Sequence, residues 1–350
     1  MRMRKNFLNL FALTALMFTA VACESDDNNN FSTEPPSLVD SVKMFVTNEG
    51  NYTKGNASVT AIMKDGSIKQ NLFRSVNGRP LGDVAQSMSL IDSHFYIVLN
   101  NSKKVEVVDG ATFRSTATIL FYNPQAQPRY ICGIGGNKAV LSDAGCDTLR
   151  VIDTESFKII DRIAVGSPTN QMTFASGKLF VKAGEQTLVY NPTTKNTSVL
   201  DIAAFADTKM LLDGDKKLWL LCSDATKTEL VKIDPATEQV LERKELEGIM
   251  LDQWVTELEY YNGAIYFSSI DENYRARIYC YTIATGELAL AFEPQSVVFM
   301  YGMGFSNGNP IICDALDFVQ SGYIHEMTTS GTEVKSYKVG VCPSVVLSLE

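Results

Sequence analysis

Short runs of alternating apolar and polar residues fill the chain from about residue 42 to its end, and clusters of Gly, Asn, Asp and Pro separate them. The stretch from 94 to 119, HFYIVLNNSKKVEVVDGATFRSTATI, holds three such runs. Its first run is β-branched or aromatic and the other two alternate, which is typical of strands. The breaks at 100–102 and 109–110 consist of residues that supply turn geometry. This stretch therefore predicts an antiparallel meander.

The same unit recurs along the chain. Segments that match its first strand occupy 42–48, 94–100, 137–143, 177–183, 216–222, 263–269 and 308–314. Turns that match its second break follow them in the same order, at 64–67, 109–112, 153–156, 191–194, 234–237, 283–286 and 328–331. Successive first strands begin 39 to 52 residues apart, which is the spacing of four-stranded propeller blades and not that of ankyrin or tetratricopeptide repeats.

The repeats also predict where the blades begin and end. Residues 42–75 supply only three strands, and the segment 341–350 has the length and alternation of one innermost strand. Complete four-strand copies run at about 84–119, 129–164, 168–202, 206–247, 252–294 and 298–340. We therefore expect an all-β fold, a seven-bladed β-propeller over 42–350, in which the N- and C-terminal strands together close one blade. Such a ring leaves no long open sheet edge.

The first residues of the chain follow a different pattern. Three positive charges precede an apolar run over 7–22, which is shorter than the roughly 20 residues of a spanning helix. The segment Ala-Val-Ala-Cys at 20–23 resembles a lipobox, in which small residues precede a cysteine that is acylated. This arrangement predicts a lipoprotein signal peptide over 1–22, acylation of Cys23, and a flexible tether over 23–41. The acidic segment 25–27 resembles an export signal of surface lipoproteins in one group of Gram-negative bacteria. We therefore expect an outer-membrane lipoprotein that is exposed on the cell surface and contacts the membrane through its lipid anchor only.

Charge and residue counts argue against several classes of function. Loss of the signal peptide would remove three positive charges and take the formal net charge from −9 to −12, which disfavours nucleic-acid binding. The two histidines, His94 and His325, stand apart, and the sequence has no CxxC pair, GxSxG elbow, P-loop or DxDxDG. We therefore predict no metal site, no catalytic residue and no cofactor. Cys132 and Cys146 share a blade and could pair, but their spacing leaves this open.

Several segments carry a resemblance to a known group of proteins. They are NEGNYTKGNASVT (48–60), NGRPLGDVAQSM (77–88), LNNSKKVEVVD (99–109), QPRYI (127–131), DQWVTEL (252–258), YGMGF (301–305) and DALDF (314–318). With these segments, residues 42–350 resemble bacterial surface lipoproteins described as YncE-like or YVTN-type seven-bladed propellers, WD40-like in architecture, of a domain family of unknown function. Some relatives in this group capture cobalamin and pass it to a TonB-dependent outer-membrane transporter, and the resemblance implies the same activity and partners here.

The longer and less regular loops are expected on one face of the predicted ring, where function is usually found on such scaffolds. We expect this face to form a ligand site with aromatic walls, polar amides and guanidinium groups. The candidate residues are Asn51, Tyr52, Asn100, Asn101, Arg129, Trp254, Tyr274, Arg275, Asp314 and Phe318. Two alternatives stay open. The asparagines could serve to form turns without contacting a ligand. Tyr130 and Tyr301 could begin strands and pack in the core.

Three functions compete at this point. The first is a non-enzymatic module that captures a small-molecule ligand, with a corrinoid as the best single candidate, and that works as a monomer or in a transporter complex. The second is a scaffold that docks another protein on the same face. The third is a propeller enzyme of the lactonase or quinoprotein kind, which the histidine count disfavours. The sequence favours the first function without naming the ligand.

Overall fold

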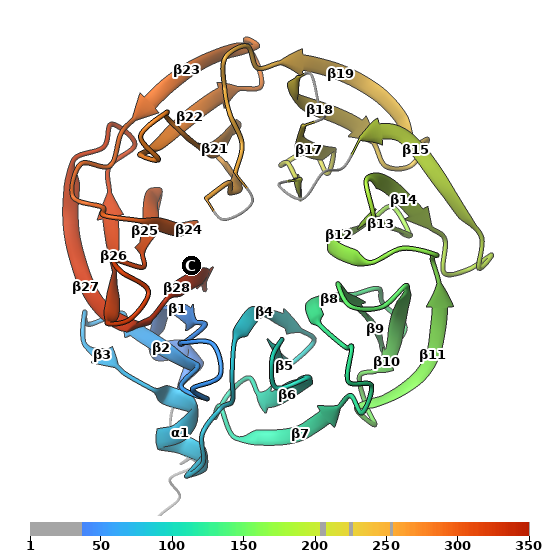
Figure 1. The fold of residues 1–350 in the computed structure, drawn as a ribbon, viewed down its shortest axis with the longest axis vertical. Helices are drawn as coiled ribbons and strands as arrows, with labels where there is room; N and C mark the ends of the chain where they lie inside the picture. The colour runs from blue at the N-terminus through green and yellow to red at the C-terminus, as the bar shows by residue number, and fades with distance from the viewer. Residues whose placement is uncertain (1–36, 204–207, 224–226, 253–254, 350) are drawn as a thin grey trace, which may run out of the picture. The chain divides into compact units, whose positions relative to one another are not determined.

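Seven four-stranded antiparallel sheets surround a common axis in the computed structural model, which describes residues 37–203, 208–223, 227–252 and 255–349. Figure 1 looks down this axis and shows the sheets as the blades of a ring. The seven-bladed β-propeller that the repeat spacing predicts is therefore confirmed. No helix in the described part of the chain is long and apolar enough to cross a membrane.

Six blades are continuous in sequence, and each runs from an innermost to an outermost strand. Their strands are β4 (Ala85–Ile91), β5 (His94–Leu99), β6 (Lys104–Asp109) and β7 (Ser115–Leu120); β8 (Pro128–Gly133), β9 (Lys138–Asp143), β10 (Thr148–Asp153) and β11 (Lys158–Ala164); β12 (Thr169–Ala175), β13 (Lys178–Ala183), β14 (Gln186–Tyr190) and β15 (Thr197–Ala203); β16 (Lys209–Leu212), β17 (Leu218–Ser223), β18 (Thr228–Asp234) and β19 (Gln239–Glu245); β20 (Leu258–Tyr261), β21 (Ala264–Ile270), β22 (Ala276–Thr282) and β23 (Glu287–Phe292); β24 (Met300–Ser306), β25 (Asn309–Asp314), β26 (Ser321–Met327) and β27 (Glu333–Val341).

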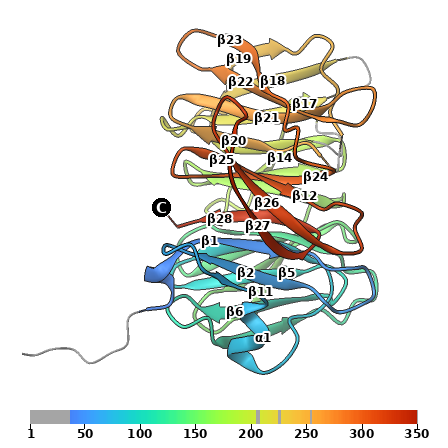
Figure 2. The same ribbon diagram turned by 90° about the vertical axis from the view of Figure 1, so that its left-hand side faces the viewer.

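The closing blade combines both ends of the propeller chain, as predicted. Its strands, from the axis outward, are β28 (Pro343–Ser348), β1 (Val42–Asn48), β2 (Ser58–Met63) and β3 (Ile68–Lys69). β28 pairs with β1 from Met44 opposite Ser348 to Asn48 opposite Pro343, and Figure 2 shows the two strands side by side. β1 is the one strand that β28 pairs with in its sheet, so this single pairing closes the ring.

The outer part of this blade departs from the predicted pattern. β3 has only two residues, and the chain then forms the short helix α1 (Leu72–Asn77). Apolar residues at 72, 73 and 76 give this helix one apolar face, and Leu72 and Phe73 are buried beside Phe113. Gly78 follows the helix with a left-handed φ of 69°, a conformation that glycine adopts without strain. The helix thus covers apolar surface that the short β3 leaves open.

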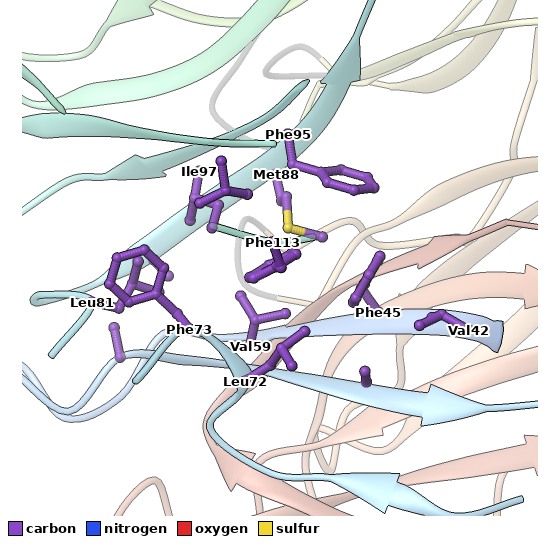
Figure 3. Close-up of a cluster of buried hydrophobic side chains, with 14 of the residues drawn as sticks. Val42, Phe45, Val59, Leu72, Phe73, Leu81, Met88, Phe95, Ile97 and Phe113 are labelled. Atoms are coloured by element: carbon purple, nitrogen blue, oxygen red, sulfur yellow. The ribbon is translucent and has the colours of Figure 1, made fainter. Parts of the chain in front are cut away.

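The core consists of apolar clusters in which side chains of neighbouring blades pack together. Figure 3 shows one cluster between the closing blade and the next, where the Phe45 ring lies 5.1 Å from that of Phe95 and 5.3 Å from that of Phe113. Trp219, which the sequence places in a core strand, is 0% exposed. Its indole Nε1 donates a hydrogen bond to Asp213 over 2.8 Å.

No disulfide joins the cysteines that the structure describes. The structure therefore answers the question of pairing between Cys132 and Cys146, because no disulfide joins them. Cys222 and Cys313 are buried in strands, where a thiol packs as a small apolar group. The fold is thus held together by strand pairing and apolar packing.

Candidate functional site

β-Bulges interrupt the start of five innermost strands. In each case the pairing with the next strand outward skips one or two residues, so that these residues have no partner in the ladder. The skipped residues are Gln86 in β4, Arg129 and Tyr130 in β8, Asn170 and Gln171 in β12, Tyr301 in β24, and Ser344 in β28. A bulge re-aims side chains that regular alternation would place elsewhere, and bulges are frequent beside functional sites.

All of these skipped residues line one cavity of about 590 Å³. The innermost strands that carry them stand around the ring axis in Figure 1, so we call this cavity the axial pocket. It is also lined by Glu49, Gly50, Asn51, Tyr52, Val84, Asn100, Thr208, Lys209, Glu257, Phe318, Cys342 and Val345. Every blade therefore contributes side chains to a single site.

Three polar pairs connect neighbouring blades within this pocket. Arg129 of β8 donates a hydrogen bond from its guanidinium group to the side-chain oxygen of Gln86 on β4. Lys209 Nζ lies 3.1 Å from Glu257 Oε1, which precedes β20. Tyr301 Oη of β24 donates to Glu49 Oε2 over 3.0 Å. The cationic groups are thus already engaged with partners from the next blade.

Burial dominates the electrostatics of the pocket carboxyl groups. It raises the pKa of Glu49 to about 7, against the opposing effects of the Tyr301 hydrogen bond and the Arg129 charge. Burial likewise raises the pKa of Glu257, although the Lys209 charge opposes it. The pKa of Glu259, which does not line the pocket itself, rises to about 8 through burial and the charge of Glu257. Carboxyl groups that exchange protons near neutral pH are characteristic of functional sites.

Aromatic side chains form part of the rim of the pocket. Tyr52 is 70% exposed and Phe318 is 37% exposed. The Phe318 ring meets those of Phe299 and Tyr301 edge to face, with centroid distances of 4.7 and 5.3 Å. Asn51 Nδ2 donates to the backbone oxygen of Phe318 over 2.6 Å, which ties the two rim loops together. The rim therefore offers apolar surface that is held in place by packing and hydrogen bonding.

The structure brings together half of the residues that the sequence selected. Asn51, Tyr52, Asn100, Arg129 and Phe318 line the axial pocket. Tyr130 and Tyr301, which could have packed in the core, line it as well. Binding by these residues stays a prediction, but their proximity is a fact of the fold.

The other candidates lie elsewhere. Tyr274 and Arg275 line a separate cavity of about 300 Å³. The Nδ2 group of Asn101 donates to Asp83 over 2.7 Å, so this amide ties the loop between β5 and β6 to the segment that precedes β4. Trp254 lies outside the residues that the structure describes.

Asp314 has a structural environment, which corrects the expectation that it faces a ligand. Its side chain is 1% exposed, and its carboxylate accepts hydrogen bonds from the backbone N–H groups of Val298, Phe299 and Leu316 at 2.9 to 3.0 Å. His325 Nε2 lies 3.6 Å from the same carboxylate. Asp314 is the last residue of β25 and precedes a tight turn, where an aspartate commonly holds the turn together.

His325 gives this blade a testable pH dependence. Burial alone would lower the pKa of the imidazole, but the carboxylates of Asp314 and Glu333, the latter 2.9 Å from Nδ1, outweigh burial and raise it. A group whose pKa rises on folding adds stability below its unfolded pKa and loses that stability as pH rises through the folded pKa. We expect the wild type to exceed His325→Gln in free energy of unfolding by on the order of 1 kcal/mol at about pH 5.5 and by less at about pH 8.5. Urea unfolding at both pH values measures this, and a difference that grows with pH would contradict it.

Sequence reasoning missed many pocket residues. They are Glu49, Gln86, Asn170, Gln171, Lys209, Glu257 and Ser344. Most lie at the start of an innermost strand. Regular alternation predicts that side chains there point to one of the two faces of the sheet, and not into a pocket. A usable signal was present, because each blade repeat has a polar side chain or tyrosine at this position. That regularity across repeats marks a ring of side chains around the axis.

The family of the chain can now be stated. Residues 43–298 match the family described as Domain of unknown function (DUF5074). The chain belongs to that family. This match confirms the expectation of a domain family of unknown function. DUF5074 itself carries no assigned activity. No curated protein matches the sequence.

Solved structures resemble this DUF5074 member over most of its length. A quinoprotein alcohol dehydrogenase-like protein from Bacteroides thetaiotaomicron is 15% identical, with a TM-score of 0.68 over 88% of this chain and 78% of that chain. A proposed 6-phosphogluconolactonase from Bacteroides fragilis is 13% identical, with a TM-score of 0.64 over 90% of this chain and 100% of that chain. A virginiamycin B lyase from Staphylococcus aureus is 12% identical, with a TM-score of 0.58 over 79% of this chain and 93% of that chain. At such identities the likeness shows the fold alone.

Proposed function

We propose that the protein captures a small-molecule ligand in the axial pocket without transforming it. The observation that carries the proposal is the set of bulges that directs polar side chains from several blades into one cavity of about 590 Å³, a volume typical of small-molecule sites. The groups presented are mainly amides, tyrosines and charged groups that already have hydrogen-bond partners, which suit hydrogen bonding. Cys342 adds no nucleophile, because burial raises the pKa of its thiol to about 11.

A wide, uncharged ligand that carries amide groups suits this pocket best. Asn100, Asn170 and Gln171 offer side-chain donors and acceptors, and Tyr52 and Phe318 offer aromatic surface at the rim. A corrinoid has these properties, because its ring is broad and bears carboxamide groups around its edge. The pocket would hold part of such a ligand and the rim would cover the rest.

We also propose that the protein acts as an outer-membrane lipoprotein, acylated at Cys23 and exposed on the cell surface, and that it passes its ligand to a TonB-dependent transporter. One feature of the described chain supports this arrangement. Leu38 donates a backbone hydrogen bond to Ala111, in the turn between β6 and β7, over 2.8 Å. Leu38 comes shortly before the start of β1 at Val42. The pocket lies at the other end of β1, where Glu49 follows the strand. Leu38 therefore lies on the face opposite the pocket.

Titration of the full-length protein with cobalamin by isothermal calorimetry tests the capture function. We expect binding, and we expect Tyr52→Ala to weaken it roughly tenfold, because an exposed aromatic side chain at a pocket rim carries a disproportionate share of binding energy. Tyr122→Ala is the matched control, since Tyr122 is 89% exposed and does not line the pocket. The absence of heat, or equal losses in both variants, would contradict the proposal.

A docking scaffold is the second candidate, and one observation favours it. Val298, Val319 and Tyr274 do not line the axial pocket but lie in loops on the same face of the ring, and they are 70 to 72% exposed. Exposed apolar side chains that gather on one face are a mark of protein interfaces. The same calorimetry separates the two functions. A scaffold would give no heat with cobalamin at any concentration.

A further inference from the structure

We propose that Glu49 is the proton-binding group of the axial pocket: the pocket captures an uncharged ligand with the Glu49 carboxyl group protonated and releases it when that carboxyl ionises. This inference rests on the proposed capture function and deepens it, because it specifies the charge of the ligand and the condition for release.

The position of Glu49 supports this role. It follows β1 directly and lines the pocket. Its Oε2 atom accepts the hydrogen bond from Tyr301 Oη over 3.0 Å, and no second hydrogen bond to this carboxylate is found within the part of the chain that the structure describes. The other oxygen is therefore available to a ligand.

The charged and titratable groups that face Glu49 come from five elements of the ring. They are Tyr301 of β24, Arg129 of β8, Lys209 of β16, Glu257 before β20, and Cys342 before β28. Arg129 and Lys209 are hydrogen-bonded to Gln86 and Glu257. An ionised Glu49 thus has no cation in hydrogen-bond contact among the described residues, which is why burial raises its pKa to about 7.

These neighbours also select the charge of the ligand. In the capture state, in which Glu49 is protonated, a cationic ligand would be repelled by Arg129 and Lys209, and an anionic one by Glu257. An uncharged ligand avoids both costs. A carboxamide on such a ligand can accept the O–H of a protonated Glu49 and donate its N–H to the other oxygen, so that no charge is buried.

Ligand binding should therefore take up a proton. A ligand that covers the pocket removes water from Glu49 and disfavours its charged form further, so the pKa is higher in the complex than in the free protein. Affinity is then constant below about pH 7, where Glu49 is already protonated. Above that pH it falls by about tenfold per pH unit until the pKa of the complex is reached.

Calorimetric titration of the full-length protein with cobalamin from about pH 6 to pH 8.5, in buffers of different ionisation enthalpy, measures both the slope and the proton count. We expect uptake approaching one proton near pH 8 in the wild type and an affinity that no longer depends on pH in Glu49→Gln. Glu155→Gln, an exposed carboxylate on the opposite face that bonds Asn137, should keep the wild-type slope. A wild-type affinity that rises with pH over this range would overturn the proposal.

Glu259 is the competing proton site, because its pKa is also raised, to about 8. A pH dependence that persists in Glu49→Gln and disappears in Glu259→Gln would overturn the assignment to Glu49.

Carbon-13 NMR of labelled glutamate carboxyl groups in the ligand-free protein keeps this test separate from the capture function. A carboxyl that titrates near pH 7 and disappears in Glu49→Gln supports the proposal, even if cobalamin gives no heat and that ligand is abandoned. If the carboxyl resonance of Glu49 does not titrate near neutral pH, the proposal is wrong whatever the ligand is.

Discussion

Removal of residues 341–350 is expected to abolish the stable monomeric ring. The deletion takes away β28, the innermost strand of the closing blade and the partner of β1. It also removes Val346, which packs against a cluster that contains Met44 and Ile311. β1 would then present an unpaired edge to the axis, and such edges promote aggregation.

The loss should exceed the ordinary effect of a point mutation. A domain is stable by only about 5–15 kcal/mol in total, and this deletion removes a complete ladder together with its packing. Size-exclusion chromatography and thermal unfolding, monitored by circular dichroism, measure the outcome. A synthetic peptide of residues 341–350, added in trans, should restore part of the stability. A truncated protein that stays monomeric and melts at the wild-type temperature would show that the pairing of β28 with β1 does not hold the ring.

The fold could be predicted from sequence because its determinants are local and repeated. Alternation within strands and the turn residues between them recur in the same order, and the short segment 341–350 supplies the strand that the first blade lacks. Helix α1 was not predicted, because its six residues are too few for a clear helical period and gain their stability from burying Leu72 and Phe73.

The site was predicted less well, for a physical reason. Loop residues such as Asn51 and Tyr52 stand out by type, and the structure places them at the pocket. Gln86 and Gln171 do not stand out, because a bulge is a feature of strand pairing and pairing register is not visible in one strand alone. Asp314 shows the converse error. Its type suggested a ligand group, yet three backbone N–H groups occupy its carboxylate.

Gly302→Ala is expected to destabilise the ring by on the order of 3 kcal/mol, at the upper end of the cost of overpacking. Gly302 lies in β24, next to the closing strand, and a Cβ atom at this position would lie 1.9 Å from the backbone oxygen of Ser344. A backbone atom cannot rotate away as a side chain can. β28 would have to shift and weaken its pairing with β1.

Gly133→Ala is the matched control for this prediction. Gly133 ends the innermost strand β8, and a Cβ atom there would meet a side-chain methyl carbon of Ile91 at 3.0 Å. This methyl group can give way by a small rotation, so the cost should stay near 1 kcal/mol. Urea unfolding of the two variants compares the costs directly, because both add one methyl group to an innermost strand. If the two alanine variants lost the same free energy of unfolding, the close approach of β24 to the closing strand would not be what requires glycine at position 302.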